Sequence, residues 1–274
     1  MHFKLTIEYA GTRYSGWQIQ KNARTVQGEL ARAIGAVTGA RDFELYGSGR
    51  TDAGVHALAQ VAHLDVQTSL SPEQLLRRVN EELPADISIL HAEVVRHRFH
   101  ARHDARGRSY LYQISKRKTA FAKPFVWWVK DELDVERMRS AASHFVGRHD
   151  FHAFSDDDPS EKSTDVLVEG VEIHQDGDLI IIRVEGSHFI WKMVRRMVGV
   201  LVEVGRGGIA PEDLERVLQS GPTGSKQLSP ANISRLTAPA AGLFLERVYY
   251  ERERESRPYA LSRYGAISPA RVGR

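Results

Sequence analysis

The sequence predicts an α+β protein built from two tandem β-α-β-β-α-β units. Short segments alternate apolar and polar residues, as strands with one buried face do, and longer segments repeat apolar residues every three or four positions, as helices do. These segments follow the same order twice, which is the ferredoxin-like arrangement. We therefore expect a mixed, mainly antiparallel sheet with helices on one face, an N-terminal half at 1–104, a C-terminal half at 105–250 and a basic tail at 251–274.

The elements of the first half are bounded by capping and turn residues. Thr25 can cap a helix whose apolar residues share one face, and Ser71-Pro72-Glu73-Gln74 forms a capping box that opens a second helix. Pro84 ends that second helix because proline cannot continue it. Alternation predicts four strands, at residues 2–10, 43–46, 55–66 and 87–95.

The second half repeats this order with different sequences. Asp134 can cap a helix, and Gln175-Asp176-Gly177-Asp178 is a good turn between two strands of a hairpin. Apolar spacing predicts a further helix, and Pro211 starts a short extra one. The predicted strands are 108–115, 166–174, 179–185 and 243–250, and the helix with the apolar stripe is 193–204.

Composition places the chain among ordinary globular proteins. Its 274 residues are 42% hydrophobic and 27% charged, and no apolar run approaches the roughly 20 residues that span a bilayer. The first residues alternate instead of forming the apolar block of a signal peptide, so we expect a cytoplasmic protein without a membrane partner. The absence of cysteine excludes disulfides and thiolate metal sites.

The charge is unevenly distributed. Without the tail at 251–274, 32 basic residues face 32 acidic ones, so the body of the protein is neutral. Residues 96–118, which we call the basic strip, carry eight arginines and lysines against Asp104 alone. A basic strip on a neutral body fits a polyanion held in a groove, although a solvated charged face would also explain it.

The segment Gly47-Ser48-Gly49-Arg50-Thr51-Asp52-Ala53-Gly54-Val55-His56-Ala57 is the strongest candidate for chemistry. It is longer than a plain hairpin turn. Its glycines let a ligand approach the main chain, and between them lie one basic residue, Arg50, and one acidic residue, Asp52. It is not a phosphate-binding loop, because it leads into a strand and not into a helix. From the residues alone, an ordinary turn containing Asp52 remains an equal alternative.

Other motifs are weaker. The pattern His97-x-x-His100-x-x-His103 resembles a ligand array, but the surrounding arginines disfavour a cation, and we predict no metal site. The run Asp156-Asp157-Asp158 reads as a solvated loop. Tyr110, within the basic strip, could stack on a nucleic-acid base, or it could fill a core together with Tyr112.

These residues closely resemble the tRNA pseudouridine synthase A family. The resemblance runs from about residue 3 to residue 250 and rests on the whole Gly47–Ala57 segment in the company of several shorter motifs. These are Tyr9-Ala10-Gly11-Thr12, Gly16-Trp17-Gln18-Ile19-Gln20, Phe99-His100-Ala101-Arg102, Arg108-Ser109-Tyr110, Gly147-Arg148-His149-Asp150-Phe151, Met193-Val194-Arg195 with Gly199, and Thr237-Ala238-Pro239 leading to Gly242-Leu243.

The resemblance implies an isomerase that converts uridine to pseudouridine at positions 38, 39 and 40 of the tRNA anticodon stem-loop without a cofactor. Asp52 matches the family's nucleophile, Arg195 the basic residue paired with it, and Arg50 the arginine that helps to extrude the nucleotide. Tyr110 matches the tyrosine that stacks on the target base. The family also implies a homodimer with tRNA bound across both subunits. We expect further substrate contacts from residues in the matching motifs, namely His56, Arg102 and Leu243.

Departures from the family leave other functions to consider. The tail beyond Tyr250, an insertion at Ser225–Leu236, and Lys162-Ser163-Thr164 in place of an Arg-Thr pair put the range of substrates in doubt. A non-catalytic RNA-binding protein would leave the Asp52 loop unexplained. A small-molecule hydrolase would need a second carboxylate or a metal. A pseudouridine synthase for other RNAs is a further alternative.

Overall fold

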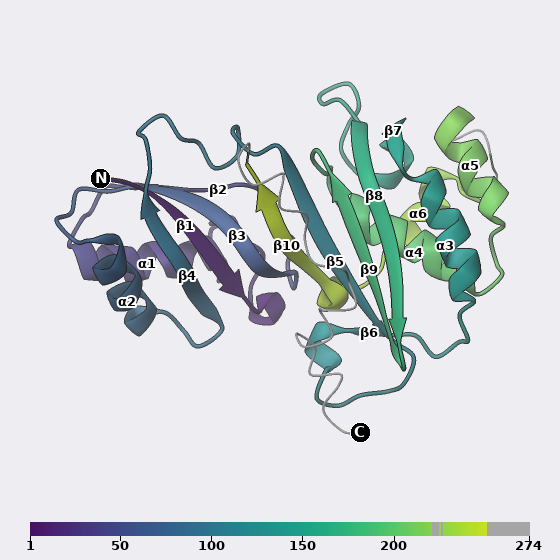
Figure 1. Cartoon of the computed structure of the whole chain (residues 1–274), viewed down its shortest axis with the longest axis horizontal. Coiled ribbons are helices and arrows are strands. Elements are labelled where there is room, and N and C mark those ends of the chain that lie inside the picture. The colour runs from purple at the N-terminus through teal and green to yellow at the C-terminus, as the bar shows by residue number, and fades with distance from the viewer. Residues whose placement is uncertain (221–224, 226, 251–274) are drawn as a thin grey trace. The chain divides into compact units, whose positions relative to one another are not determined.

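The computed structural model describes residues 1–220, 225 and 227–250, and the predicted tail at 251–274 lies outside these residues. Among the described residues, the chain forms two compact units: residues 1–106 with 244–250, and residues 107–243 (Figure 1). Each unit contains strands and helices, so the predicted α+β class is confirmed. The tandem ferredoxin-like arrangement remains a prediction. In the described part of the chain, no helix is long and apolar enough to cross a membrane.

The first unit is built around the antiparallel strands β1 (His2–Tyr9), β3 (His56–Asp65) and β4 (Ile87–Val94), with β1 between the other two. The short strand β2 (Glu44–Gly47) pairs antiparallel with β3. Burial alternates along β1 from Phe3 to Tyr9, as its sequence pattern predicts, whereas in β3 the consecutive residues 60–64 are all buried.

The two helices of the first unit begin at the predicted caps and lie side by side (Figure 1). Helix α1 (Val26–Thr38) starts after Thr25, whose hydroxyl accepts the Gly28 N–H. Helix α2 (Pro72–Glu82) starts after Ser71 with both hydrogen bonds of the capping box in place. Satisfying these first-turn N–H groups fixes where each helix begins. A 3₁₀ helix, η1 (Gly11–Arg13), follows β1.

The last strand, β10 (Leu243–Tyr249), returns to the first unit. It pairs in parallel with β3, with Phe244 opposite His56 and Leu245 opposite Ala57. The predicted division, which placed all of 105–250 in the C-terminal half, differs from this pairing. A strand's own alternation shows that one face is buried but does not show which neighbour it pairs with.

The second unit contains an antiparallel sheet in the order β5-β9-β8-β7. Its strands are β5 (Gly107–Ser115), β7 (Gly147–Asp150), β8 (Asp165–Asp176) and β9 (Leu179–Gly186), and the short β6 (Trp127–Trp128) pairs in parallel with β5. The predicted hairpin joins β8 and β9, with Gly177 at a positive φ of 57° in the turn.

The part of the second unit that the structure describes contains four α-helices, and three of them were predicted. Asp134 caps α3 by accepting the Arg137 N–H. The fourth helix, α6, spans only six residues within the segment read as an insertion, and its N-cap is Ser229. The helices are α3 (Val135–His144), α4 (Met193–Gly205), α5 (Pro211–Ser220) and α6 (Pro230–Arg235), with the 3₁₀ turns η2 (Lys123–Phe125), η3 (His152–Phe154) and η5 (Ala240–Gly242).

Candidate active site

Asp52 lies on the loop that connects β2 to β3. Its side chain is half-buried, whereas Arg50 is exposed. A turn follows Asp52 directly, since its carbonyl oxygen accepts the Val55 N–H at 3.1 Å. The loop therefore holds a carboxylate that is accessible and whose backbone position is fixed. The predicted ordinary turn is present, but it accounts for only part of the loop.

The segment between β1 and α1 holds the Asp52 loop from one side. The hydroxyls of Tyr9 and Thr51 are hydrogen-bonded at 2.8 Å, and the Trp17 N–H donates to the Thr51 carbonyl at 3.1 Å. The Gly54 N–H donates to the Tyr14 carbonyl at 3.3 Å. Residues on both sides of Asp52 are thus bonded to the segment that carries the two N-terminal motifs, which gives those motifs a structural role.

Two glycines of that segment allow the loop to approach closely. A Cβ on Gly11 would lie 1.9 Å from the Val55 carbonyl oxygen, so any side chain there would displace the loop. A Cβ on Gly16 would lie 2.6 Å from the Thr51 carbonyl oxygen, and Gly16 also has a positive φ of 93°. Side chains at either position would clash with backbone atoms, which cannot move aside cheaply.

Gln60 on β3 secures the start of the loop. This buried side chain accepts from the Ser48 hydroxyl at 2.7 Å and donates to the Gly49 carbonyl at 3.1 Å. The Ser48 N–H also donates to the Val61 carbonyl at 2.7 Å. The chain just before Arg50 is therefore attached to β3, and these bonds restrict the backbone from which the Arg50 side chain projects.

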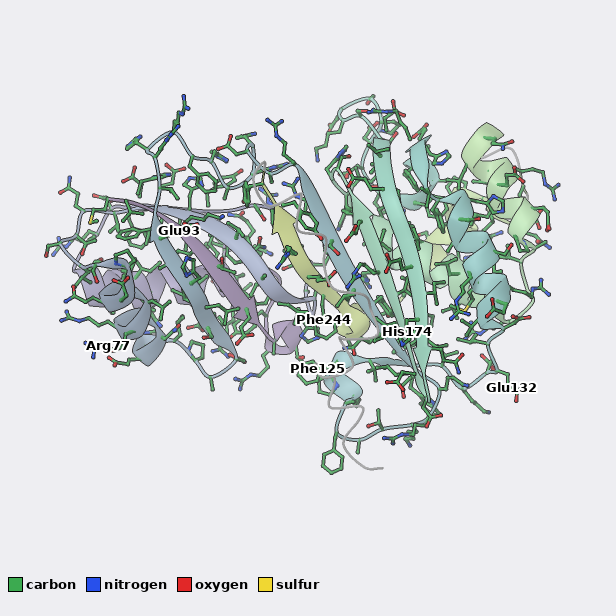
Figure 2. The ribbon with its side chains drawn as sticks, in the orientation of Figure 1. Arg77, Glu93, Phe125, Glu132, His174 and Phe244 are labelled. Carbon is green, nitrogen blue, oxygen red and sulfur yellow. The ribbon has the colours of Figure 1, made fainter. Side chains whose placement is uncertain are left out.

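His56 is placed inside the first unit. It is 1% exposed, and its Nδ1 accepts the Gly11 N–H at 3.0 Å. Its ring stacks on that of Phe244 of β10, the residue labelled in Figure 2, with centroids 4.7 Å apart. These contacts join the end of the Asp52 loop to η1 and to the last strand. They give His56 a structural role, and its predicted contact with substrate stays a prediction.

Arg195 lies in the first turn of α4 and is anchored to the Thr237-Ala238-Pro239 motif. Its Nε donates to the Ala238 carbonyl at 2.7 Å, and the Ala238 N–H donates back to the Arg195 carbonyl at 3.0 Å. A Cβ on Gly199, one turn later, would lie 1.7 Å from the Leu236 carbonyl oxygen. Helix α4 is thus packed directly against the chain that fixes the Arg195 guanidinium.

The two tyrosines of β5 have different environments. Tyr112 is fully buried, and its hydroxyl donates to the Pro239 carbonyl at 2.7 Å. Burial raises the pKa of the Tyr112 hydroxyl, and the positive charge of Arg195 opposes that shift. Tyr110 is half-buried and meets Phe189 edge to face, with centroids 5.1 Å apart. Tyr112 is therefore a core residue, as the alternative reading allowed, whereas Tyr110 keeps an accessible surface.

Two residues of the acidic run 156–158 fix the start of α4, namely Asp156 and Asp157, while Asp156 and Asp158 are exposed, as expected of a solvated loop. Asp156 pairs with Arg196, which is 1% exposed, and also with the Lys192 ammonium at 2.7 Å. Asp157 accepts the Trp191 N–H at 2.9 Å. The hydrogen bonds from Lys192 and Arg196 outweigh burial and lower the pKa of Asp156. This role of Asp156 and Asp157 was not predicted from the sequence. The only signal for it was a pair of consecutive arginines, Arg195 and Arg196, which need acidic partners.

The predicted site residues divide between the two units. Arg50, Asp52, His56 and Arg102 belong to the first unit. Tyr110, Arg195 and the buried Leu243 belong to the second. Within the first unit, Arg102 is exposed on the segment after β4, and its N–H donates to His100 Nδ1 at 3.1 Å. Pairing of Asp52 with Arg195 would join the units and stays a prediction.

The histidines of the basic strip belong to a larger cluster in the first unit. His100 lies 4.6 Å from His63 and 4.2 Å from His103, measured between ring centroids, and His2 lies 5.3 Å from His63. His63 Nδ1 accepts the Ala101 N–H at 3.1 Å, so this ring supports the chain next to Arg102. Among the described residues, no group of three or more metal-ligating side chains could hold an ion.

Acidification is expected to destabilise the protein through this cluster. Burial, together with the neighbouring His100, lowers the pKa of His63, and burial together with His103 lowers that of His100. The folded state therefore binds fewer protons than the unfolded chain, so the free energy of unfolding decreases as the pH falls through and below the ordinary histidine value of 6.5. Thermal unfolding between neutral and mildly acidic pH measures this change.

The matched variants for this prediction are His63→Gln and His91→Gln. His63 is buried, whereas His91 is exposed on β4 of the same unit. His63→Gln should lower the stability at neutral pH and flatten its decrease with acidification, while His91→Gln should leave the pH dependence unchanged. An unaltered pH dependence in His63→Gln would show that the cluster does not cause the acid sensitivity.

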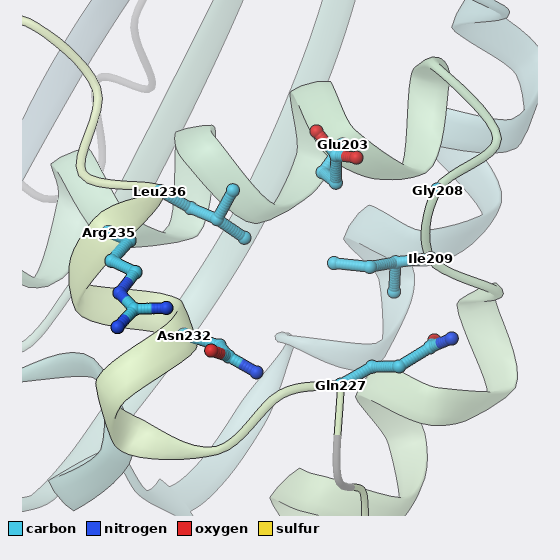
Figure 3. A pocket seen from close by; sticks show the side chains of 7 residues that line it. All are labelled: Glu203, Gly208, Ile209, Gln227, Asn232, Arg235 and Leu236. Atoms are coloured by element: carbon cyan, nitrogen blue, oxygen red, sulfur yellow. The ribbon is translucent and has the colours of Figure 1, made fainter.

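A pocket of about 340 Å³ lies in the second unit between the end of α4 and α6 (Figure 3). It is lined by both charged and apolar side chains, and none of them is a predicted site residue. The lining residues are Glu203, Gly208, Ile209, Gln227, Asn232, Arg235 and Leu236. The pocket is therefore separate from the residues that carry the predicted chemistry.

Comparisons with known proteins agree with the residues described above. A family model described as tRNA pseudouridine synthase matches residues 5–104 and 141–251. "tRNA pseudouridine synthase A 2" of Bacillus anthracis is 38% identical over 91% of this chain and 99% of its own length, and the Clostridium tetani protein of that name is 39% identical over 90% and 98%. "tRNA pseudouridine synthase A" of Exiguobacterium sibiricum is 37% identical over 90% and 96%.

The matched ranges contain the Asp52 loop, its supporting segment and α4 with Arg195, and they leave 105–140 unmatched. The resemblance found in the sequence is confirmed, and so is the prediction that the chain is an isomerase acting on uridine in tRNA. The chain belongs to the tRNA pseudouridine synthase family.

Proposed function

We propose that this enzyme isomerises uridine to pseudouridine at positions 38, 39 and 40 of the tRNA anticodon stem-loop, with Asp52 as the nucleophile. The observation that carries the proposal is the construction of the Asp52 loop. Its backbone is bonded to the segment before α1 on both sides of a half-buried carboxylate. A nucleophile must be accessible and also held in place, and this loop meets both requirements.

The reaction needs a carboxylate but no cofactor. The C–N glycosidic bond of uridine breaks, the freed uracil rotates, and a C–C bond forms between the ring and the sugar, so that no atom is lost and no redox change occurs. The sugar carbon becomes electron-poor as its bond to nitrogen breaks, which favours a carboxylate beside it, as in glycosidases. Asp52 acts by attacking either the sugar or the base.

The other residues prepare the substrate and the nucleophile. Arg195, held by Ala238, would pair with Asp52 and keep it ionised and oriented. Arg50 would help to extrude the target nucleotide, and Tyr110 would stack on the extruded uracil. Removing a base from its stack costs a few kcal/mol, which phosphate contacts elsewhere in the complex can offset. Arg102, His56 and Leu243 are the further substrate contacts in this proposal.

The proposed assembly is a homodimer with one tRNA bound across both subunits, in the cytoplasm. The basic strip supports a polyanionic partner, because its exposed arginines on the segment after β4 provide cations for phosphates. Size measurement by light scattering, with and without tRNA, tests the number of chains and of RNA molecules in the complex.

Pseudouridine formation on an unmodified tRNA transcript tests the activity directly. The transcript carries uridine at 38–40, no metal or nucleotide is added, and carbodiimide labelling followed by primer extension locates the product. Stops confined to those positions are the expected result. Stops elsewhere would assign the enzyme to other sites, and binding without any stop would contradict the proposal.

Substitutions of Tyr110 should separate the role of its ring from that of its hydroxyl. Phenylalanine keeps a ring that can stack on uracil, so Tyr110→Phe should retain most of the turnover, whereas Tyr110→Ala should lower it by roughly tenfold to a hundredfold, because stacking contributes about 1–3 kcal/mol per base. Single-turnover rates on the same transcript measure both variants. Equal losses would show that the hydroxyl, and not the ring, is required.

A further inference from the structure

The connection from β5 to β6 carries an unusual concentration of positive charge. Residues 116–130 contain five basic residues and no acidic one. All five side chains are exposed: Lys116, Arg117, Lys118, Lys123 and Lys130. An acidic neighbour from outside the segment, Asp178, approaches Arg117 at 3.7 Å. The whole segment lies within residues 105–140, which the family model does not match.

This connection is a folded part of the second unit. The Ala122 N–H donates to the Thr119 hydroxyl at 3.2 Å, and the Phe125 N–H donates to the Ala122 carbonyl at 2.8 Å. The Gln113 side-chain amide donates to the Phe125 carbonyl at 3.2 Å and ties η2 to β5. Because these hydrogen bonds hold the backbone of the segment, the Cα positions of its exposed side chains are fixed.

Two aromatic side chains point away from this folded segment. Ala122, Val126 and Val129 are buried, whereas Phe121 is 77% exposed and Trp128 is 43% exposed. The Lys118 ammonium lies 5.8 Å from the centre of the Trp128 ring. The segment therefore buries its small apolar residues and exposes two of its four aromatic rings among cations, the combination with which proteins bind unpaired nucleotides.

We propose that residues 116–130 form a second RNA-contact surface, on which an unpaired base of the tRNA stacks on Phe121 or Trp128 while lysines pair with adjacent phosphates. The inference rests on the proposed function, because it takes tRNA as the substrate. The cations supply attraction that does not depend on sequence, and each ring supplies a face for one base. Lys118 and Lys123 lie close enough along the chain to Phe121 to pair with phosphates next to a stacked base.

The charge of the surface favours RNA over a second copy of the chain. In a twofold-symmetric dimer, a patch at the symmetry axis meets the same patch of its partner. Five cations would then face five cations across a contact that removes water, and like charges in such a contact repel strongly. RNA phosphates have the opposite charge, and the bases between them are flat and apolar on their faces.

The test compares four variants of the full chain by the affinity for an unmodified tRNA transcript at several salt concentrations. Phe121→Ala/Trp128→Ala removes the rings, Phe121→Trp keeps a ring, and Lys118→Gln/Lys123→Gln removes charge. The matched control is Leu90→Ala/Val94→Ala, which removes exposed apolar side chains of 47% and 52% exposure from β4. Thermal unfolding and light scattering on each variant report its folding and its oligomeric state.

The variant without rings should bind tRNA about tenfold more weakly or worse, the control pair should bind as the parent does, and Phe121→Trp should keep the affinity and show quenched tryptophan emission when tRNA is added. The lysine variant should reduce the slope of log affinity against log salt by about 0.7 for each phosphate of a single strand that no longer pairs with a lysine. These changes should occur with unchanged melting temperature and size.

The possible results lead to different conclusions. Unchanged affinity of the variant without rings, in a protein that still forms pseudouridine, would overturn the surface but leave the proposed function standing. Conversion of a dimer to monomers by the same variant would assign the surface to contact between copies and would also overturn the inference. Ring-dependent tRNA binding by a parent enzyme that forms no pseudouridine would contradict the proposed function alone.

Discussion

Replacing Asp52 with asparagine is expected to lower the rate of pseudouridine formation by ~10⁴-fold or more, as loss of a nucleophile does in other enzymes. The amide has nearly the shape of the carboxylate but cannot form the covalent bond or stabilise positive charge at the sugar. The hydrogen bonds described above that hold the loop use backbone groups and the side chains of other residues, so those bonds should persist in the variant. Single-turnover kinetics measure the rate, and anisotropy of labelled tRNA measures the affinity, which should change little.

The control for this prediction is Asp42→Asn, which neutralises an exposed aspartate shortly before β2 in the same unit. It should retain the parental rate, because it changes the net charge by the same amount but lies outside the loop, before β2. Mass spectrometry must exclude deamidation back to aspartate at position 52. A rate close to that of the parent in a preparation verified in this way would remove Asp52 from the role of nucleophile.

Replacing Gly11 with alanine should damage the enzyme without touching a residue that reacts. The new Cβ would lie 1.9 Å from the Val55 carbonyl oxygen and 2.6 Å from its carbonyl carbon, so the Asp52 loop must move. Such overpacking costs about 1–3 kcal/mol of stability. A displacement of roughly 1 Å at a nucleophile can also lower the rate by ~10²-fold. Thermal unfolding and single-turnover kinetics measure the two effects.

The comparison for Gly11→Ala is Gly49→Ala in the Asp52 loop itself, where a Cβ would meet nothing within 4 Å. Its stability should stay within about 0.5 kcal/mol of the parent. If Gly11→Ala were destabilised but turned over normally at a temperature where it is folded, the contact with Val55 would not be what positions Asp52. A fully stable Gly11→Ala would contradict the close packing of η1 against the loop.

Much of the fold could be predicted because its signals are local. A helix cap bonds to backbone N–H groups only a few residues away, and a turn bends the chain over a similarly short distance. The sequence nearby is therefore enough to place the caps at Thr25, Ser71 and Asp134 and the turn at Gly177. Helix α6 has a local start signal too, since Ser229 caps it and Pro230 follows, but its six residues are too short to show a periodic apolar pattern.

The sequence predicted which residue types form the candidate site. It was less informative about the residues that hold the site residues in place. The glycines around Asp52 were visible in the sequence, but the close approach of Gly11 and Gly16 to the loop is a tertiary contact that the sequence does not show. Asp156 shows the same limit more clearly. It pairs with Arg196 across 40 positions, and a run of three aspartates in a loop normally indicates solvent exposure. Long-range ion pairs leave no periodic trace in a single sequence.

The return of β10 to the first unit has a consequence for how the enzyme is made. The chain enters the first unit, leaves it after residue 106, and re-enters it at Phe244, which stacks on His56 at the end of the Asp52 loop. During synthesis, Asp52 therefore emerges from the ribosome nearly two hundred residues before the strand that completes its own unit. A polypeptide interrupted anywhere before β10 would lack a partner for the parallel edge of β3, so incomplete chains carry the Asp52 loop without the finished unit around it.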